Sequence, residues 1–422
     1  MLPLDCGQQF DLSDDDSFFS ALPEEPGVLL IEMKDAAAEP YLARTADIRR
    51  AAERLLRAPE TPWKRLNLRD VAAGARYRVT GSKFEQTLTM YQQAREHFPL
   101  RYRALLKLRS PAVLKVNLRN EYPRCYVTRS VRADGAFYLG PFASRALAEG
   151  FAQDFLDLFK IRRCQIKIRR DPAFPGCIYS EMKMCLAPCF AGCTKEDYDV
   201  EVGRVVRTLA TAGEALTEEL EHEREAASEA LDFERASNLH KRLEKVSSHL
   251  RTLPEIARRI DTLDAVILQR AAEEKTIIVF PLISGILREP IFLRFAELAS
   301  EPRSVEAILR TGLEPQTGTA QAQSVAAGAE SPSEALAPTE PAKQAYSPTS
   351  PDDFAIRAVA PELPEHLSLV ARWFYSKPRD GEIFFRDSAW PYRRILRACS
   401  RLLSPPVSQT SPPSSGAEPR SK

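Results

Sequence analysis

The sequence contains no long apolar run and no recognisable secretory leader. A membrane-spanning helix needs about 18 or more consecutive apolar residues, and no window of this 422-residue chain reaches that length. The opening stretch, MLPLDCGQQFDLSDDDSFF, is acidic and lacks the basic and then apolar order of a signal peptide. We therefore expect neither an integral membrane protein nor a secreted one, but a cytoplasmic protein.

The chain also has little net charge and lacks the short cysteine spacings of zinc ribbons. Its formal net charge is +1, so only local clusters of charge can indicate a partner. None of its eight cysteines forms a C-x2-C pair. Because disulfides are rare in a reducing cytosol, we expect clustered cysteines to be thiolate ligands rather than a disulfide framework.

Five of the eight cysteines lie in one basic stretch, residues 159–193, with the spacing C-x12-C-x7-C-x3-C-x3-C. Four thiolates suit either a tetrahedral zinc ion or a [4Fe–4S] cluster. The longer spacings favour iron–sulfur, but spacing alone does not decide, and buried or incidental cysteines remain the structural alternative. The five are Cys164, Cys177, Cys185, Cys189 and Cys193, the last being one more than a four-thiolate site needs.

Hydrophobic periodicity predicts an α+β chain. Asp47 is expected to cap a helix that follows two short strands. Thr194 and Asp197 resemble a capping box, and Asp232 is expected to cap the second arm of a helical hairpin bent at 231–233. Strands are predicted at 28–32, 40–43, 113–118, 124–130 and 136–142 and in a small antiparallel sheet within 262–296. Helices are predicted at 48–56, 84–96, 144–159, 194–250, 367–375 and 390–403, with the strand-like IFF between the last two.

Seven motifs follow one another along the chain: LPEEPGVLLIEM, PYLARTADIRR, EYPRCYVTRS, FYLGPF, DLFKIRRC, C-x7-CLAPC and EALDFERA. In this order they resemble the UvrC family of excinuclease proteins. The resemblance covers about residues 21–300, and UvrC proteins carry a GIY-YIG nuclease domain, a [4Fe–4S] segment and a UVR motif that contacts the UvrB helicase. It implies that Cys164, Cys177, Cys185 and Cys189 are the cluster ligands and that Cys193 lies outside the pattern; zinc is the alternative.

The resemblance divides the chain into consecutive units. We expect a small GIY-YIG-like α/β domain, a cysteine-rich segment, a UVR hairpin, a small antiparallel β region, and a disordered linker and tail. The family's RNase H-like half is absent beyond a possible beginning at 262–296. The units are 1–20 (mobile N-terminus), 21–105 (degenerate GIY-YIG), 106–160 (β/α extension), 161–194 (cysteine-rich), 195–256 (helical, with the UVR motif at 217–250), 257–312 (β region), 313–352 (linker), 353–403 (helical aromatic and basic piece) and 404–422 (tail).

The nuclease motifs depart from the family pattern at the catalytic positions. GIY-YIG nucleases position water with tyrosines, neutralise phosphate charge with an arginine and hold a metal with a glutamate. Tyr41 survives, but the resemblance places Leu29 at a tyrosine, Ala51 at the arginine and Tyr91 at the glutamate. We therefore expect no catalytic residues and no functional magnesium site. The shifted residues that could substitute are Arg50, Arg54 and, almost two turns from the glutamate position, Glu85.

Two surfaces are candidates for macromolecular contact. A basic run beside the cysteines could neutralise DNA phosphates, against the alternative of a solvated basic surface. The apolar stripe of the hairpin could bind a UvrB-like helicase, against intramolecular packing. The aromatic C-terminal piece could stack on single-stranded DNA, but we favour a small core. The basic residues are Lys160, Arg162, Arg163, Lys167, Arg169 and Arg170, and the partner-binding residues are Leu231, Phe233, Ala236, Leu239 and Leu243.

The leading hypothesis is therefore a UvrC-like nucleotide excision repair protein that binds DNA and UvrB without nuclease activity. One alternative is an active single-incision GIY-YIG endonuclease with relocated catalytic groups. Another is a regulatory adaptor that does not bind DNA.

Overall fold

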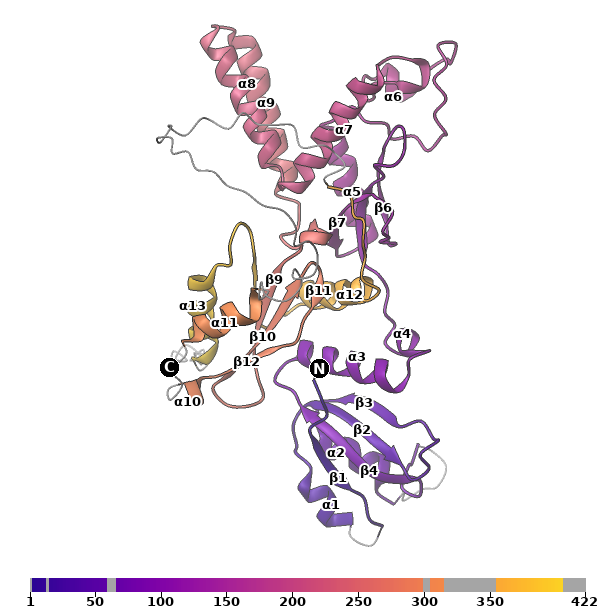
Figure 1. Ribbon diagram of the computed structural model, residues 1–422, viewed down its shortest axis with the longest axis vertical. Coiled ribbons are helices and arrows are strands. Elements are labelled where there is room, and N and C mark those ends of the chain that lie inside the picture. The colour runs from indigo at the N-terminus through magenta and orange to yellow at the C-terminus, as the bar shows by residue number, and fades with distance from the viewer. Residues whose placement is uncertain (1, 13–14, 59–65, 299–303, 315–353, 405–422) are drawn as a thin grey trace, which may run out of the picture.

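The computed structural model describes residues 2–12, 15–58, 66–298, 304–314 and 354–404. Within them the fold is α+β, as the sequence predicts, with three antiparallel sheets. Figure 1 shows the N-terminal sheet at one end of an elongated molecule, a helical hairpin and the cysteine segment as two arms at the other end, and the remaining sheets between. No helix in these ranges is long and apolar enough to cross a membrane.

The N-terminal sheet has the order β1-β4-β2-β3 and is packed against two helices. Asp47 caps the second of them by accepting a hydrogen bond of 2.8 Å from the Arg50 backbone N–H, as predicted. Strand β4 was not predicted from the sequence. The elements are β1 (Cys6–Gln9), α1 (Asp15–Ala21), β2 (Gly27–Met33), β3 (Tyr41–Thr45), α2 (Ile48–Leu56) and β4. Strand β4 spans Ala72–Val79.

The expectation of a mobile N-terminus at residues 1–20 is wrong. Strand β1 pairs with β4, and α1 follows it. This segment is polar overall but contains three phenylalanines, Phe10, Phe18 and Phe19. Their side chains are buried together against β2, β4 and α2. Burying a phenylalanine side chain contributes about 1.5–3 kcal/mol, and this contribution holds the segment on the sheet.

Helix α3 (Lys83–His97) connects the N-terminal sheet to the rest of the molecule, and α4 (Tyr102–Leu105) follows it. Ser82 caps α3 by accepting a hydrogen bond from the Glu85 backbone N–H. Phe84, Leu88 and Tyr91 are buried in a core shared with the C-terminal helix α12 (Leu363–Phe374). The helix predicted at 84–96 is confirmed, and it is covered from both sides.

The middle sheet has the order β6-β5-β7-β8, and its last strand comes from beyond the hairpin. Helices α5 and α7 share its core. The capping box predicted at Thr194 and Asp197 is present at the start of α7. The elements are β5 (Ala112–Val116), β6 (Cys125–Thr128), β7 (Phe137–Phe142), α5 (Arg145–Leu156), α6 (Ile178–Glu181), η1 (Pro188–Phe190), α7 (Lys195–Ala210) and β8 (Arg258–Arg259).

The predicted helical hairpin is confirmed as α8 (Glu214–Glu229) and α9 (Phe233–Leu250). Asp232 caps α9 by accepting a hydrogen bond of 3.0 Å from the Arg235 backbone N–H. Leu231 forms the bend with a φ of 58°, in the left-handed region. The hairpin therefore turns where the sequence predicts.

The third sheet joins two pieces that the sequence analysis kept apart, 257–312 and 353–403. Strand β13 pairs antiparallel with β9, so the C-terminal piece completes this sheet. Its aromatic residues are buried in the core, as we favoured. The elements are η2 (Ile260–Thr262), β9 (Ala265–Arg270), β10 (Thr276–Ile283), β11 (Ile286–Leu287), β12 (Ile291–Arg294), α10 (Phe295–Leu298), α11 (Val305–Leu313), β13 (Glu382–Phe385) and α13 (Tyr392–Leu403).

The predicted disordered linker and tail lie outside the described residues, except at their edges. Leu313 ends α11 and Glu314 follows it, while Leu403 ends α13 and Ser404 follows it. The disorder predicted for 315–352 and 405–422 therefore stays a prediction.

Candidate functional site

Four cysteines line one cavity between the loops that precede α7. The cavity has a volume of about 230 Å³, and apolar side chains such as Ile168 and Phe174 form much of its wall. The loops are fixed by backbone hydrogen bonds, including one of 2.9 Å from the Asp171 N–H to the Cys189 carbonyl. The four are the predicted ligands Cys164, Cys177, Cys185 and Cys189.

Among these thiols Cys189 is buried and the other three are half-buried, and they would repel one another when ionised. Burial raises the pKa of Cys185 to about 11, and the neighbouring Cys164, Cys177 and Cys189 raise it further against a hydrogen bond from the Ala187 N–H. That hydrogen bond reaches the Cys185 sulfur at 3.3 Å. A cation or cationic cluster among the sulfurs would offset this repulsion.

The spacing of the sulfurs bears on which group could fit. A zinc ion requires four ligands converging on one point, with Zn–S distances of about 2.3 Å. In the part of the chain that the structure describes, no three His, Cys, Asp or Glu side chains converge closely enough to hold a metal ion. The four cysteines are among the residues that line the cavity. Cys193 does not line it and packs against the core of the middle sheet.

Two of the six predicted DNA-binding residues do not lie on a free surface. Arg162 is buried, and its guanidinium donates to the backbone carbonyls of Tyr122 and Ile166 at 2.7 and 2.8 Å. Arg163 pairs with Asp157 at 2.8 Å. Both side chains hold the cysteine loops in place, so including them in the DNA-binding patch was wrong. The sequence could not show this because a basic run looks alike whether its side chains turn in or out.

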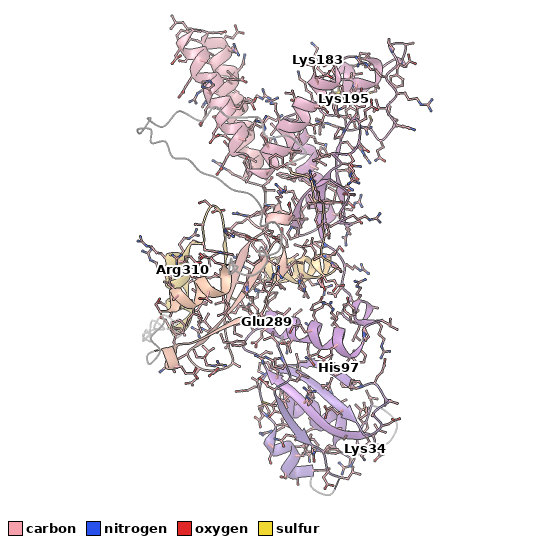
Figure 2. All side chains as sticks on the ribbon, in the orientation of Figure 1. Lys34, His97, Lys183, Lys195, Glu289 and Arg310 are labelled. Atoms are coloured by element: carbon pink, nitrogen blue, oxygen red, sulfur yellow. The ribbon has the colours of Figure 1, made fainter. Side chains whose placement is uncertain are left out.

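The other four basic residues are exposed, and their predicted contact with DNA stays a prediction. None of them has an acidic partner among the described residues. Figure 2 shows this arm, with Lys183 and Lys195 labelled, far from Arg310 on α11. We call this set the arm patch; it consists of Lys160, Lys167, Arg169 and Arg170.

The positions where the resemblance places catalytic groups are part of the hydrophobic core. Leu29 on β2 and Ala51 on α2 are buried in the core of the N-terminal sheet. Tyr41 is half-buried against the same core. Arg50 and Arg54, the possible substitutes for the arginine, are exposed. The apolar side chains at the first two positions carry no group that could position water or neutralise phosphate.

Tyr91, at the position of the metal-binding glutamate, belongs to a buried network that the sequence analysis missed. Its hydroxyl donates a hydrogen bond of 2.6 Å to Glu365 on α12. The same carboxylate accepts from the Tyr102 hydroxyl at 2.8 Å and from the Arg103 guanidinium at 2.5 Å. Burial would raise the pKa of Glu365, but these hydrogen bonds outweigh it and hold the pKa below its usual range. We call these four residues the Glu365 network.

His366 lies beside this network and is neutral near pH 7. Burial lowers the pKa of His366 to about 4, although Glu362 and Glu365 act in the opposite direction. Its Nδ1 accepts a hydrogen bond of 3.1 Å from the Leu287 N–H. The side chain thus bridges α12 and β11. Its contact with Tyr91, at a ring-centroid distance of 5.5 Å, completes the packing over α3.

Glu85, the acid in α3 that the sequence suggested as a substitute, does not replace the glutamate that the resemblance implies. Its carboxylate lies 3.3 Å from the Arg78 guanidinium and accepts a hydrogen bond of 2.9 Å from the Gly81 N–H. Burial raises its pKa despite these partners. Both oxygens therefore stabilise the start of the helix and β4 and do not face a substrate.

The apolar stripe of the hairpin divides into a buried and an exposed part. Leu239 and Leu243 are buried in the core shared with α5 and α7, and Ala236 is half-buried there. Predicting Leu239 and Leu243 as partner contacts was therefore wrong, and the intramolecular alternative holds for them. Leu231 and Phe233 remain 71% and 67% exposed at the tip. We call these two residues the hairpin tip.

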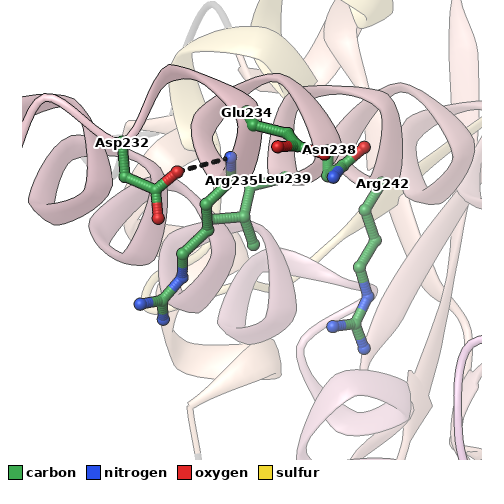
Figure 3. A pocket seen from close by; sticks show the side chains of 6 residues that line it. All are labelled: Asp232, Glu234, Arg235, Asn238, Leu239 and Arg242. Atoms are coloured by element: carbon green, nitrogen blue, oxygen red, sulfur yellow. Dashed lines mark hydrogen bonds between the residues drawn. The ribbon is translucent and has the colours of Figure 1, made fainter.

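A surface hollow of about 430 Å³ lies along α9 below the tip. Figure 3 shows Arg235 and Arg242 extending on the same side of the helix, with Leu239 between them. Arg242 also donates to the Leu158 carbonyl at 3.4 Å. The other lining residues are Asp232, Glu234 and Asn238.

The comparisons with known proteins agree with these features. Residues 112–208 match the family model described as UvrC/Cho excinuclease, middle domain. This match contains strands β5, β6 and β7 of the middle sheet, the four cysteines of the cavity and most of α7. Over these residues the chain is similar to excinuclease-related proteins.

The relatives extend the match over most of the chain. A "UvrABC system protein C" from Moorella thermoacetica is 28% identical over 292 residues, 68% of this chain and 47% of the relative. Those from Oleidesulfovibrio alaskensis and Desulfatibacillum aliphaticivorans are 32% and 28% identical, covering 60% and 71% of this chain and 36% and 50% of the relatives. The chain is similar to proteins of the UvrC family and spans half the length of these relatives or less. No solved structure matches it significantly.

Proposed function

We propose that this protein acts in nucleotide excision repair as a UvrC-like protein that binds DNA and a UvrB-type helicase but does not cut DNA. The observation that carries the proposal is the burial of Leu29, Ala51 and Tyr91 at the three positions where the resemblance places catalytic groups. Similarity to the UvrC family supports the pathway, and the exposed arm patch and hairpin tip support the two binding activities.

The chemistry of phosphodiester cleavage explains why these three positions matter. The reaction develops negative charge that an arginine and a metal ion must stabilise, and losing one such group typically costs about 10²–10³ in rate. Here an alanine and a hydrogen-bonded tyrosine stand at the two positions. Because both contributions are missing together, the chain retains the scaffold without the stabilising charges.

DNA binding is assigned to the arm patch. Its four cations stand on the loops that carry the cysteines. On duplex DNA, log affinity falls as log salt concentration rises. Each phosphate that a lysine or arginine neutralises makes this slope steeper by about 0.9. We expect K167A/R169A/R170A to weaken binding and to flatten this slope.

Helicase binding is assigned to the hairpin tip. Two large apolar side chains exposed at the end of a projecting hairpin suit insertion into an apolar groove of a partner. Leu231 also holds a left-handed backbone conformation that costs a non-glycine residue about 1–2 kcal/mol. Such strain at an exposed bend fits a functional contact.

We further propose that Cys164, Cys177, Cys185 and Cys189 hold a [4Fe–4S] cluster. A multi-iron cluster distributes four thiolates around its corners, which fits cysteines that line a cavity better than a single zinc ion does. Bound there, it would tie the two halves of the segment together and support the arm patch. Anaerobically purified protein should absorb at about 400 nm, and a colourless sample with stoichiometric zinc would contradict this assignment.

The experiment that tests the proposal combines the purified chain, a UvrB-type helicase and damaged duplex DNA with Mg²⁺. We expect a ternary complex and no nicks. Nicking that requires the metal and this chain would support the single-incision endonuclease instead. Affinity for DNA that does not fall as salt rises would support the adaptor that makes no phosphate contacts.

A further inference from the structure

The strongest charged surface outside the features described so far is the outer face of α13. The helix buries Ile395, Ala398 and Cys399 against the third sheet, so its other face is fixed toward solvent. Arg393, Arg394 and Arg397 are exposed on that face, and the helix contains no acidic residue. We call these three residues the α13 arginines.

Acidic groups near this face are already engaged by other arginines. Glu382 pairs with Arg401 at 2.6 Å. Asp264 and Glu314 pair with Arg386 and Arg310 at 3.4 and 3.6 Å. The α13 arginines, in contrast, make no ion pair with any described residue; the guanidinium of Arg394 lies 5.6 Å from the centre of the Phe384 ring.

The placement of these arginines opposes the local preference of the helix. Arg393 and Arg394 stand in its first turn, where unsatisfied N–H groups already create partial positive charge. Pro391 precedes them as an N-cap without a side-chain hydrogen bond, and no acid occupies the first turn. Two cations there are unfavourable for the isolated helix, and a bound anion would relieve the cost.

The geometry favours an extended polyanion over a single small anion. Arg393 and Arg397 lie one turn apart, which is about 6 Å along the helix axis. Phosphates of one DNA strand advance by about 3.4 Å each along the duplex, so the row faces roughly two successive phosphates. Planar guanidinium groups also match phosphate oxygens in a bidentate manner.

We propose that the α13 arginines form a second contact with the sugar-phosphate backbone of duplex DNA, separate from the arm patch. The proposal rests on the proposed DNA binding of this chain. It gives the C-terminal piece, which completes the third sheet, a role in recognition. Because phosphate contacts carry no sequence information, the contact adds affinity and positions the duplex without reading bases.

The test measures binding of the full chain to a fluorescent duplex by anisotropy across a salt series. For R393A/R394A/R397A we expect affinity to fall by about tenfold or more and the slope of log affinity against log salt to flatten by about 2 to 3. R393K/R394K/R397K keeps the charge and should retain most of the slope. The matched control is K241A/K245A/R251A, which removes the same charge from exposed positions on and just after α9 and should change neither quantity appreciably.

Each result of the binding measurement supports or refutes the contact between the α13 arginines and DNA. Unchanged affinity and slope for the α13 variant, with an unchanged melting temperature, would overturn the inference and leave this face to an acidic protein surface. Equal losses for the control variant would also overturn it, because net charge alone would then explain the effect. If the wild-type chain binds no DNA at any salt concentration, the proposed DNA binding of the protein is refuted, and the α13 contact is refuted with it. Wild-type binding with an unaffected α13 variant would refute this contact alone.

Discussion

Tyr91 stands where the resemblance places a metal-binding glutamate, and its hydroxyl donates a hydrogen bond to the carboxylate of Glu365, 274 residues away in the sequence. Hydrogen bonds to an ionised carboxylate contribute roughly 1.5–3 kcal/mol each when buried. The position therefore serves to join α3 to α12. Where the resemblance implies a residue that supplies chemistry, this chain has one that supplies stability.

We predict that Tyr91→Glu does not restore a metal site and destabilises the protein. The new carboxylate would be buried against Glu365, and an uncompensated buried charge costs about 3–5 kcal/mol. Tyr91→Phe, which removes only the hydroxyl, should cost about 1–3 kcal/mol. Chemical denaturation of the two variants and the wild type measures the difference, and a Tyr91→Glu variant as stable as Tyr91→Phe would refute the buried network.

His366 makes a separate prediction about pH. Its pKa is about 4 in the folded protein, against an ordinary value of 6.5. As pH falls from 6.5 to about 4, the unfolded chain takes up a proton and the folded protein does not, so the free energy of unfolding decreases. The loss should be on the order of 2–3 kcal/mol, from 1.36 kcal/mol for each unit of pKa. Below about pH 4 this contribution no longer changes.

The measurement is denaturant unfolding of wild type and His366→Gln at intervals from pH 7 to 4. The glutamine variant should lose less stability over this window. His222→Gln changes an exposed histidine of α8 and should follow the wild type. Parallel curves for wild type and His366→Gln would show that His366 is not buried in its neutral form.

At the scale of residues, the sequence predicted which side chains belong to the site better than it predicted whether they are buried or exposed. The four cysteines were predicted from spacing and family resemblance, and they line one cavity. Glu365 carries no sequence signal, because its partners Tyr91 and Tyr102 lie more than 260 residues away. Arg162 was misassigned for a related reason, since burial of a charge depends on carbonyl acceptors that only the fold provides.

At the scale of elements, periodicity and capping were sufficient for the hairpin. Asp232 caps α9, and the bend lies where the apolar stripe is interrupted. Strand β1 could not be predicted because its four residues are exposed and polar and are held only by pairing with β4. The sequence predicts a strand at the apolar triplet in β13, but the pairing of β13 with β9 depends on the tertiary fold and could not be predicted.

The hairpin tip gives a prediction that separates stability from binding. Leu231→Gly should raise the free energy of unfolding by up to about 1 kcal/mol, because glycine adopts the left-handed conformation without the strain of a side chain. The same change removes an exposed apolar group, so affinity for the helicase partner should fall. Phe233→Ser should lower affinity without this gain in stability. Thermal melting and calorimetric titration with a UvrB-type helicase provide the two readings; unchanged affinity in both variants would exclude the tip as the contact.

Strand β13 provides the test of how the C-terminal piece belongs to the fold. Phe384 is buried in the core between the third sheet and α13. Its replacement by alanine should cost about 3–5 kcal/mol, as for other buried aromatic residues. The measurement is denaturant unfolding with Phe374→Ala, a half-buried aromatic residue at the end of α12, as the comparison. A smaller loss at Phe384 than at Phe374 would contradict the pairing of β13 with β9.

At the scale of the whole molecule, the structure has two cationic surfaces and one apolar tip, and Leu29 and Ala51 are buried in the core of the N-terminal sheet. The arm patch and the hairpin tip stand on the two arms at one end, and the α13 arginines lie on the third sheet. Helix α12 covers α3, so the C-terminal piece closes over the position that a metal would need. This arrangement fits a protein that binds DNA and a partner without cutting.

The central claim is tested most directly by a nicking assay with damaged supercoiled duplex, the purified chain, Mg²⁺ or Mn²⁺, and a UvrB-type helicase present or absent. The account predicts that wild type and Tyr41→Phe leave the DNA equally intact under every condition while the wild type still binds it. Metal-dependent nicking by the wild type that Tyr41→Phe abolishes would contradict the account, because it would show that the N-terminal domain retains its chemistry.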